Sequence, residues 1–201
     1  MIHEKNEGDI YATYEKGKYV LHIMHDYDAQ NPRHWDNLGE FVMSHSRYSY
    51  GDKNFTNSNN YAEYVEGIPE DAVVLKVYMF DHSGLIFSTS PFGCPWDSGQ
   101  VGLIWADRKK ALDWFNETEW TDEFKERILE ILKGEIKELS LYAEGNNYGF
   151  CLHKITDCEH CGHESEETIE SCWGFLTENP VKYILEELPQ EFRELFRELM
   201  T

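Results

Sequence analysis

Short runs of apolar residues divide the chain, and the spacing inside each run predicts its secondary structure. The strongest strand signal is AVVLKVYMF, in which β-branched and aromatic residues are frequent. DHSG (81–84) follows as a turn with a permissive glycine, which predicts an antiparallel meander. Segment 40–52 fits either a strand or a short helix. The polar segment 26–39 is predicted to be an ordered loop, and 51–64 to be a mobile polar segment whose tyrosines dock part of it. Strands are predicted at 18–26, 72–80, 85–90 and 101–105.

Helical spacing of apolar residues follows the meander. Residues 107–117 begin with an aspartate suited to capping, and 121–145 begin with Thr121 as the expected N-cap. The C-terminal segment 178–201 has an apolar stripe at helical spacing and predicts two short helices that are broken at Pro189.

Two more strands are expected around a polar tip, at 148–156 and 168–176. The order of strands, helices, hairpin and helices predicts an α+β fold with a single antiparallel sheet, built from the meander plus the hairpin, and helices packed on it. A chain of 201 residues fits one domain, 1–201, and can bury roughly 70% of its unfolded surface without disulfides or metals.

The chain contains no apolar run of 18 residues, and its first residues, MIHEKNEGDIYATYEKGK, lack the pattern of a signal peptide. These features predict a cytoplasmic protein. The five cysteines are then expected to be reduced thiols or metal ligands.

The formal net charge is −20, and the charge is uneven. Residues 1–116 carry 17 acids and 10 bases, or −7, whereas residues 117–201 carry 21 acids and 8 bases, or −13. Such a field repels DNA, RNA and anionic membranes but attracts a basic groove on a protein. Solubility alone is the other explanation of the charge. The glutamates expected to contact a partner lie in the two acidic helical segments: Glu123, Glu126, Glu130, Glu135, Glu138, Glu187, Glu191 and Glu194.

The hairpin tip, 157–167, contains the sequence CEHCGHE. Cys-x-x-Cys followed by glycine resembles half of a zinc knuckle, and Cys158, Cys161 and His163 could supply three ligands, with His160 as the alternative to His163. A fourth ligand is not evident, and a metal-free reduced tip is the alternative. Symmetry of the hairpin puts Cys151 opposite Cys172 at roughly 20 Å from the tip, too far to share its metal.

Two further loops contain polar side chains that could contact a ligand or take part in acid–base chemistry. Carboxylates in a loop after a strand can hold a cation or transfer protons, but they also satisfy loop backbones. Cys94 could be a nucleophile with His82 or His45 as its base and Asp81 or Asp97 to orient that base. A loop packed on the sheet with Trp96 buried is the simpler interpretation. The residues of this ligand-loop set are Asp26, Asp28, Arg33, His82, Cys94, Trp96 and Asp97.

Several motifs of known enzymes are absent from the sequence. It has no Walker loop, no dinucleotide glycine fingerprint, no H-E-x-x-H and no G-x-S-x-G, so no nucleotide cofactor is expected and no catalytic residue is assigned.

Five segments between about 26 and 176 resemble a family of small, largely uncharacterised proteins of bacteriophages and mobile elements. They are Asp26-Tyr-Asp28, PRHWDNLG (32–39), DHSG (81–84), CPWDSGQVG (94–102) and SCWGF (171–175). The nine-residue loop is the specific part of the match. The resemblance implies a phage or mobile-element setting, in a bacterial host, and with it a role in overcoming host defence.

Two classes of function follow from these observations. The first is a non-enzymatic inhibitor of a host defence nuclease or complex, of the CRISPR-effector or restriction type, that binds through an acidic surface as a mimic of DNA. The second is an enzyme or small-ligand binder that uses the loops of Asp26, Asp28, His82 and Asp97. An assembly protein without a defence role is a further alternative, and the C-terminal stripe would permit a homodimer.

Overall fold

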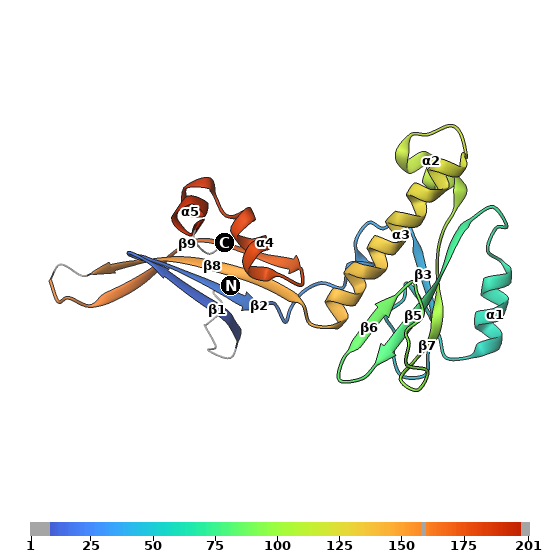
Figure 1. Cartoon of the computed structure of the whole chain (residues 1–201), viewed down its shortest axis with the longest axis horizontal. Helices are drawn as coiled ribbons and strands as arrows, with labels where there is room; N and C mark the ends of the chain where they lie inside the picture. The colour runs from blue at the N-terminus through green and yellow to red at the C-terminus, as the bar shows by residue number, and fades with distance from the viewer. Residues whose placement is uncertain (1–8, 158–159, 198–201) are drawn as a thin grey trace. The chain divides into compact units, whose positions relative to one another are not determined.

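The computed structural model describes residues 9–157 and 160–197, and its architecture is α+β with two sheets (Figure 1). The expectation of a single sheet is therefore wrong. The chain divides into two compact units. In the described residues, unit 1 comprises 9–30 and 145–197, and unit 2 comprises 31–144. The expectation of one domain stays a prediction.

Unit 1 is built on a four-stranded antiparallel sheet with the order β1-β2-β8-β9. The hairpin β8–β9 and the two C-terminal helices were expected, whereas β1 was missed because its apolar residues are few and only half-buried. Asn179 caps α4, and Pro189 separates α4 from α5. The elements are β1 (Ile10–Lys16), β2 (Tyr19–His25), β8 (Asn147–Asp157), β9 (Glu164–Leu176), α4 (Pro180–Glu187) and α5 (Gln190–Leu195).

The core of unit 1 lies between one face of this sheet and the two helices. Alternate residues of β2 and β8 point into this core. Leu21 lies opposite Leu152, and Ile23 lies opposite Phe150. Each fully buried leucine or isoleucine stabilises the fold by roughly 1.5–3 kcal/mol. The core residues are Leu21, Ile23, Tyr148, Phe150, Leu152, Ile184, Leu185, Leu188 and Phe196.

The register of the hairpin corrects the pairing expected for its cysteines. Cys151 lies opposite Ser171, and Cys172 lies opposite Phe150. Irregularities in the β8–β9 ladder shift the register by one residue, which sends the two side chains to opposite faces.

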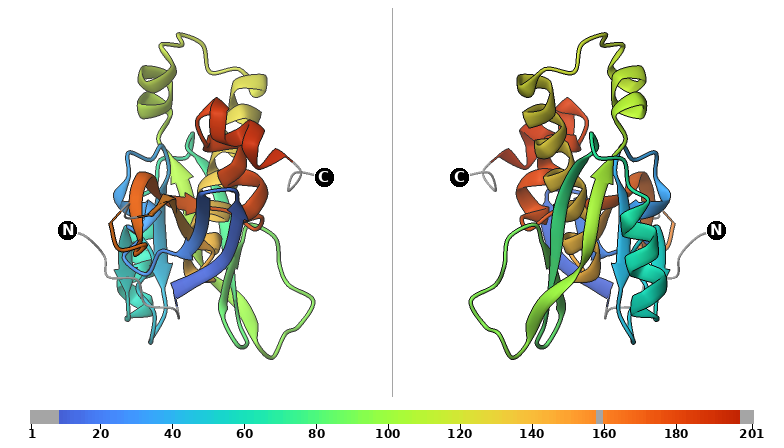
Figure 2. Two further views of the ribbon diagram at one scale, coloured as in Figure 1. Left: turned by 90° about the vertical axis from the view of Figure 1, so that its left-hand side faces the viewer. Right: turned by 90° about the vertical axis from the view of Figure 1, so that its right-hand side faces the viewer.

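Unit 2 contains a five-stranded sheet with the order β4-β3-β7-β5-β6. The strands of the predicted meander exist, but β7 pairs with β5 and not with β6, so the meander is wrong. The β6–β7 connection stands out from the end of this sheet (Figure 2). Its length allows the chain to pass to the far side of β5. The strands are β3 (Glu40–Ser44), β4 (Lys53–Phe55), β5 (Val73–Asp81), β6 (Leu85–Ser88) and β7 (Ser98–Ala106).

The long helix α3 (Asp122–Ala143) packs along one face of the five-stranded sheet. Its buried apolar residues recur every three or four positions, as expected of an amphipathic helix. The Thr121 hydroxyl accepts a hydrogen bond from the amide of Phe124, which confirms the predicted cap. Asp107 caps α2 (Arg108–Phe115) in the same way, through the amide of Lys110.

Segment 51–64, expected to be polar and mobile with some of its tyrosines docked, contains regular secondary structure. It forms β4, which pairs in parallel with β3, and the start of α1 (Ser58–Glu66). Asn57 caps α1, and the Tyr64 hydroxyl donates to Glu40 on β3. The segment is polar because one side of it faces water; it is held by hydrogen bonds and by its aromatic rings.

Candidate functional site

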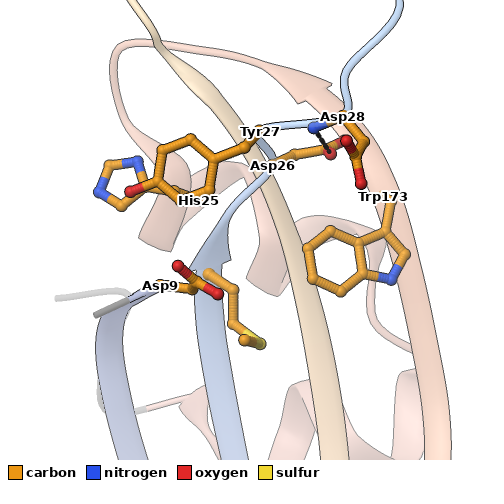
Figure 3. A pocket seen from close by; sticks show the side chains of 7 residues that line it. Asp9, His25, Asp26, Tyr27, Asp28 and Trp173 are labelled. Atoms are coloured by element: carbon orange, nitrogen blue, oxygen red, sulfur yellow. Dashed lines mark hydrogen bonds between the residues drawn. The ribbon is translucent and has the colours of Figure 1, made fainter. Parts of the chain in front are cut away.

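A pocket in unit 1 lies where β2 ends, beside the C-terminal half of β9 (Figure 3). Its volume is about 370 Å³, within the range of small-ligand sites. Residues of the DxD and SCWGF segments meet here. The lining residues are Asp9, Met24, His25, Asp26, Tyr27, Asp28 and Trp173.

Asp26 holds the two sides of the pocket together. One carboxylate oxygen, Oδ1, accepts a hydrogen bond from the amide of Asp28 at 3.2 Å, and Oδ2 accepts one from the amide of Gly174 at 3.1 Å. Gly174 has a φ of 87°, a conformation that favours glycine, and it is the extra residue of a bulge in β9 between Trp173 and Phe175. The first aspartate of the DxD segment therefore has a structural role in the pocket.

Aromatic rings form the remaining walls. Trp173 lies directly over Gly149 of β8, where a Cβ atom would overlap the indole ring. Tyr27 is 74% exposed and stacks on His25, with ring centroids 5.9 Å apart. Carboxylates beside exposed aromatic faces are complementary to an ammonium or guanidinium group, which gains both charge pairing and cation–π attraction.

Four glutamates follow the pocket along β9: Glu164, Glu166, Glu167 and Glu170. All four are exposed, and β9 is an edge strand with β8 as its only ladder partner in the described sheet. The strand contains no basic residue, although Lys154 of β8 lies opposite Glu167. The strand was predicted to begin at 168, so Glu164, Glu166 and Glu167 were assigned to the polar tip and the acidic row was missed; the alternation of glutamate with Ser and Thr was the available signal.

On α3, neighbouring lysines partly neutralise the acidic residues that were predicted to contact a partner. Lys125 pairs with Asp122 at 2.8 Å and Lys133 with Glu130 at 2.6 Å. Glu135 is only 8% exposed and is withdrawn from the predicted partner surface, because its carboxylate is used inside unit 2. The other predicted glutamates are exposed: Glu123, Glu126, Glu130 and Glu138 on α3, Glu187 on α4, Glu191 and Glu194 on α5.

Arg33 was expected in a ligand loop, but the structure buries it in an ion-pair network. Its guanidinium contacts Glu135 at 2.8 Å and Asp52 at 2.6 Å, and it also donates to the carbonyl of Gly39. Burial alone would lower the pKa of Arg33, but the hydrogen bonds and charges of the two carboxylates outweigh it and raise that pKa. A partner molecule cannot reach this guanidinium.

The remaining ligand-loop residues lie together in unit 2, in and beside the β6–β7 loop. Asp97 Oδ2 lies 3.5 Å from Cys94 Sγ and 3.5 Å from His82 Nδ1. A carboxylate thus sits against the thiol, where a thiol–imidazole catalytic pair would require the histidine. Trp96 is 92% exposed, so its predicted burial against the sheet is wrong.

The predicted zinc tip is described only in part. Cys158 lies outside the described residues, and Cys161 and His163 are exposed. None of the helices formed by residues 9–157 and 160–197 is both long enough and apolar enough to cross a membrane.

Comparison of the chain with family models, with curated proteins and with solved structures finds no match. Its function therefore has to be inferred from the chemistry of the pocket and of the adjoining strand.

Proposed function

We propose that this chain is a non-enzymatic inhibitor that binds a basic surface of a host protein through the pocket and the acidic strand β9. The observation that carries the proposal is the continuity of one sheet edge. The aspartate-lined pocket lies at one end of β9, and four exposed glutamates follow along the strand. Such an edge offers a row of negative charge and one anchoring position.

The pocket is the anchoring position for a lysine or arginine side chain. Asp28 and the Tyr27 ring are exposed, whereas Asp26 is engaged with the backbone of Gly174. A guanidinium placed between the carboxylates and the indole of Trp173 would be paired and partly desolvated. Contacts of this kind are among the strongest in protein interfaces.

The glutamates of β9 would orient the basic partner and increase the rate of its association. Like charges along an edge strand prevent two copies of the strand from pairing with each other, yet they leave the edge open to a basic segment. The net charge of −20 extends the attraction beyond the contact surface and makes association dependent on salt.

The resemblance of the motif segments to phage and mobile-element proteins suggests the class of partner. Proteins of host defence that act on nucleic acids have grooves lined with Arg and Lys that bind phosphate. We therefore infer that the target is a defence nuclease or complex of the CRISPR-effector or restriction type, whose groove the acidic edge would occupy.

The test is capture of partners from bacterial host lysate on the tagged full-length chain at low and high salt, followed by binding measurements with the purified partner. The surface variant is Glu164→Gln/Glu167→Gln/Glu170→Gln, which leaves Glu166 in place. The matched control is Glu123→Gln/Glu126→Gln/Glu130→Gln, which changes the net charge by the same amount on α3. We expect at least a tenfold loss of affinity for the first variant and a much smaller loss for the second.

A nuclease that salt releases from the wild type, and that the β9 variant no longer retains, would support the proposal. Equal losses for the two variants would mean that net charge alone acts, without a specific surface. An affinity that does not change with salt would contradict the proposal, as would a captured partner without a basic groove.

A second candidate function uses the same pocket for a small cationic ligand, and the pocket volume of about 370 Å³ favours it. Asp28→Asn and Trp173→Leu should then weaken binding of a free amine or guanidine compound. Titration of the chain with arginine, agmatine and spermidine separates the two functions by affinity: a dedicated ligand site should bind one of these compounds in the micromolar range, whereas a pocket that only anchors one side chain of a protein partner should bind them no tighter than about 1 mM.

A further inference from the structure

Two histidines and a glutamate meet on the face of the unit 1 sheet that lies opposite the helices. His22 of β2, His153 of β8 and Glu166 of β9 each place one ligand atom within 4.8 Å of the others. The two imidazole centroids are 5.4 Å apart. Both histidines are more than nine-tenths buried, with exposed fractions of 8% and 5%. Glu166 is exposed and gives the cluster access to solvent.

A threonine fixes the orientation of each imidazole. His22 Nδ1 lies 2.9 Å from Thr13 Oγ1, and His153 Nδ1 lies 3.1 Å from Thr168 Oγ1. Each threonine stands directly opposite its histidine in the strand register. A metal site formed by these rings would use Nε2 of each as the ligand atom, since Nδ1 of each is hydrogen-bonded to a threonine hydroxyl. Hydrogen bonds of this kind orient the histidine ligands of metal sites.

We propose that His22, His153 and Glu166 form a binding site for a divalent transition metal of the zinc type. Two imidazole nitrogens and one carboxylate match the three protein ligands of many zinc sites that keep a fourth position for water. The two nitrogens disfavour Ca²⁺ and Mg²⁺, which prefer oxygen. Ligand atoms around tetrahedral zinc lie about 3.3 Å apart, so small side-chain rotations would close the site.

The site would join three neighbouring strands of one sheet. Its ligands come from β2, β8 and β9, and the two supporting threonines come from β1 and β9. An ion bound there would cross-link the edge strand β9 to the centre of the sheet and would stabilise unit 1 in proportion to its affinity. This role is separate from the acidic surface, because it needs no partner protein.

The experiment is titration of the full-length chain with Zn²⁺ by calorimetry, together with Co²⁺ absorption spectra. The cysteines of the hairpin tip are removed in a Cys158→Ser/Cys161→Ser variant, so that binding at the tip is distinguished from binding at the histidines. We expect one Zn²⁺ per chain in this variant as in the wild type. Bound Co²⁺ should give a spectrum without the charge-transfer band of a thiolate ligand.

Matched variants test the individual ligands. Glu166→Gln should reduce the affinity for Zn²⁺ at least tenfold, whereas Glu167→Gln, one residue along β9 and opposite Lys154, should change it less than threefold. Thr13→Val and Thr168→Val remove the supporting hydroxyls and should each weaken binding by about 10–100-fold. Circular dichroism without metal verifies that every variant folds.

Loss of Zn²⁺ binding in the Cys158→Ser/Cys161→Ser variant, with a thiolate band in the wild type, would overturn the proposal in favour of the tip. Absence of Zn²⁺ binding, or equal effects of the two glutamine variants, would also overturn it. The β9 surface variant described above retains Glu166, so failure of the inhibitor proposal and failure of the metal site give different results.

Discussion

Glu135 on α3 lies 2.8 Å from Arg33, and its other carboxylate oxygen accepts hydrogen bonds from the amides of Leu38 and Gly39. Two residues that are 102 positions apart in sequence thus attach the segment before β3 to the long helix. Asp52 completes the network by accepting from Arg33 and from the amide of Phe41. The PRHWDNLG segment and α3 are therefore linked by charge as well as by apolar packing.

Removing Arg33 should destabilise the protein strongly. Arg33→Met leaves Glu135 and Asp52 without their cation, and Glu135 is buried, so we expect a loss of about 3–5 kcal/mol in the free energy of unfolding, measured in urea. Arg108→Met is the control, because its pair with Asp71 is about half exposed and should contribute less than ~1 kcal/mol. Equal effects of the two changes would mean that the buried network adds little stability.

Two glycines of β7 should respond in opposite directions to alanine. A Cβ at Gly102 would overlap the carbonyl oxygen of Val42 on β3, whereas a Cβ at Gly99 would meet open space. Gly102→Ala should therefore cost roughly 1–3 kcal/mol, and Gly99→Ala should be neutral or slightly stabilising. Thermal unfolding of both variants gives the comparison. A tolerated alanine at Gly102 would contradict the close approach of β3 and β7.

Tyr64 should make stability fall at high pH. Burial, and after it the hydrogen bond and charge of Glu40, raise the pKa of Tyr64 to about 12 from its ordinary value of 10.0. A raised pKa gives stability that is complete below pH 10 and is lost as the pH rises towards 12. Absorption titration should show a tyrosine ionising near 12 that Tyr64→Phe removes. A Tyr64→Phe titration identical to that of the wild type would contradict this.

Ionisation of Glu138 should also lower the stability of the protein as the pH rises, but in a lower pH range than that of Tyr64. Although the Glu138 side chain is exposed, partial desolvation by the atoms around its carboxylate is the main cause that raises the pKa of Glu138; the charge of Glu135 adds to it, while Arg33 opposes both. Its contribution to stability is therefore present below its ordinary value of 4.5 and is lost as the pH rises. Glu138→Gln should stabilise the protein at pH 7 relative to the wild type, and the gain should disappear near pH 4. If the gain in stability does not depend on pH, its cause would be the helix propensity of glutamine and not the ionisation of Glu138.

Local signals predicted most of the individual elements. The apolar runs predicted β2, β5, β6 and β7. The capping residues Asp107 and Thr121 predicted where α2 and α3 begin, and Pro189 predicted the break between the last two helices. These features depend on neighbouring residues only. The pairing of β7 with β5 and the separation into two sheets depend on contacts between distant segments, which periodicity does not report.

The site was harder to predict for the same reason. Asp26 and Asp28 were singled out, but their connection to Trp173 and Gly174 depends on β9 folding back beside β8. His22, His153 and Glu166 lie on three strands, and none of them belongs to a local motif. Arg33 was predicted to face a ligand because its negatively charged partners, Asp52 and Glu135, are remote in sequence.

The discontinuous path of the chain through unit 1 has a consequence for biosynthesis. The neighbouring strands β2 and β8 are separated by the 121 residues from 26 to 146. At about 5–20 residues per second, a ribosome needs roughly 6–24 s to supply the second strand after the first. Unit 2 is continuous and can fold during that interval, whereas β2 has to wait with its apolar residues uncovered. The nascent chain is therefore expected to need a chaperone most at β2, and slower translation of residues 31–144 should increase aggregation.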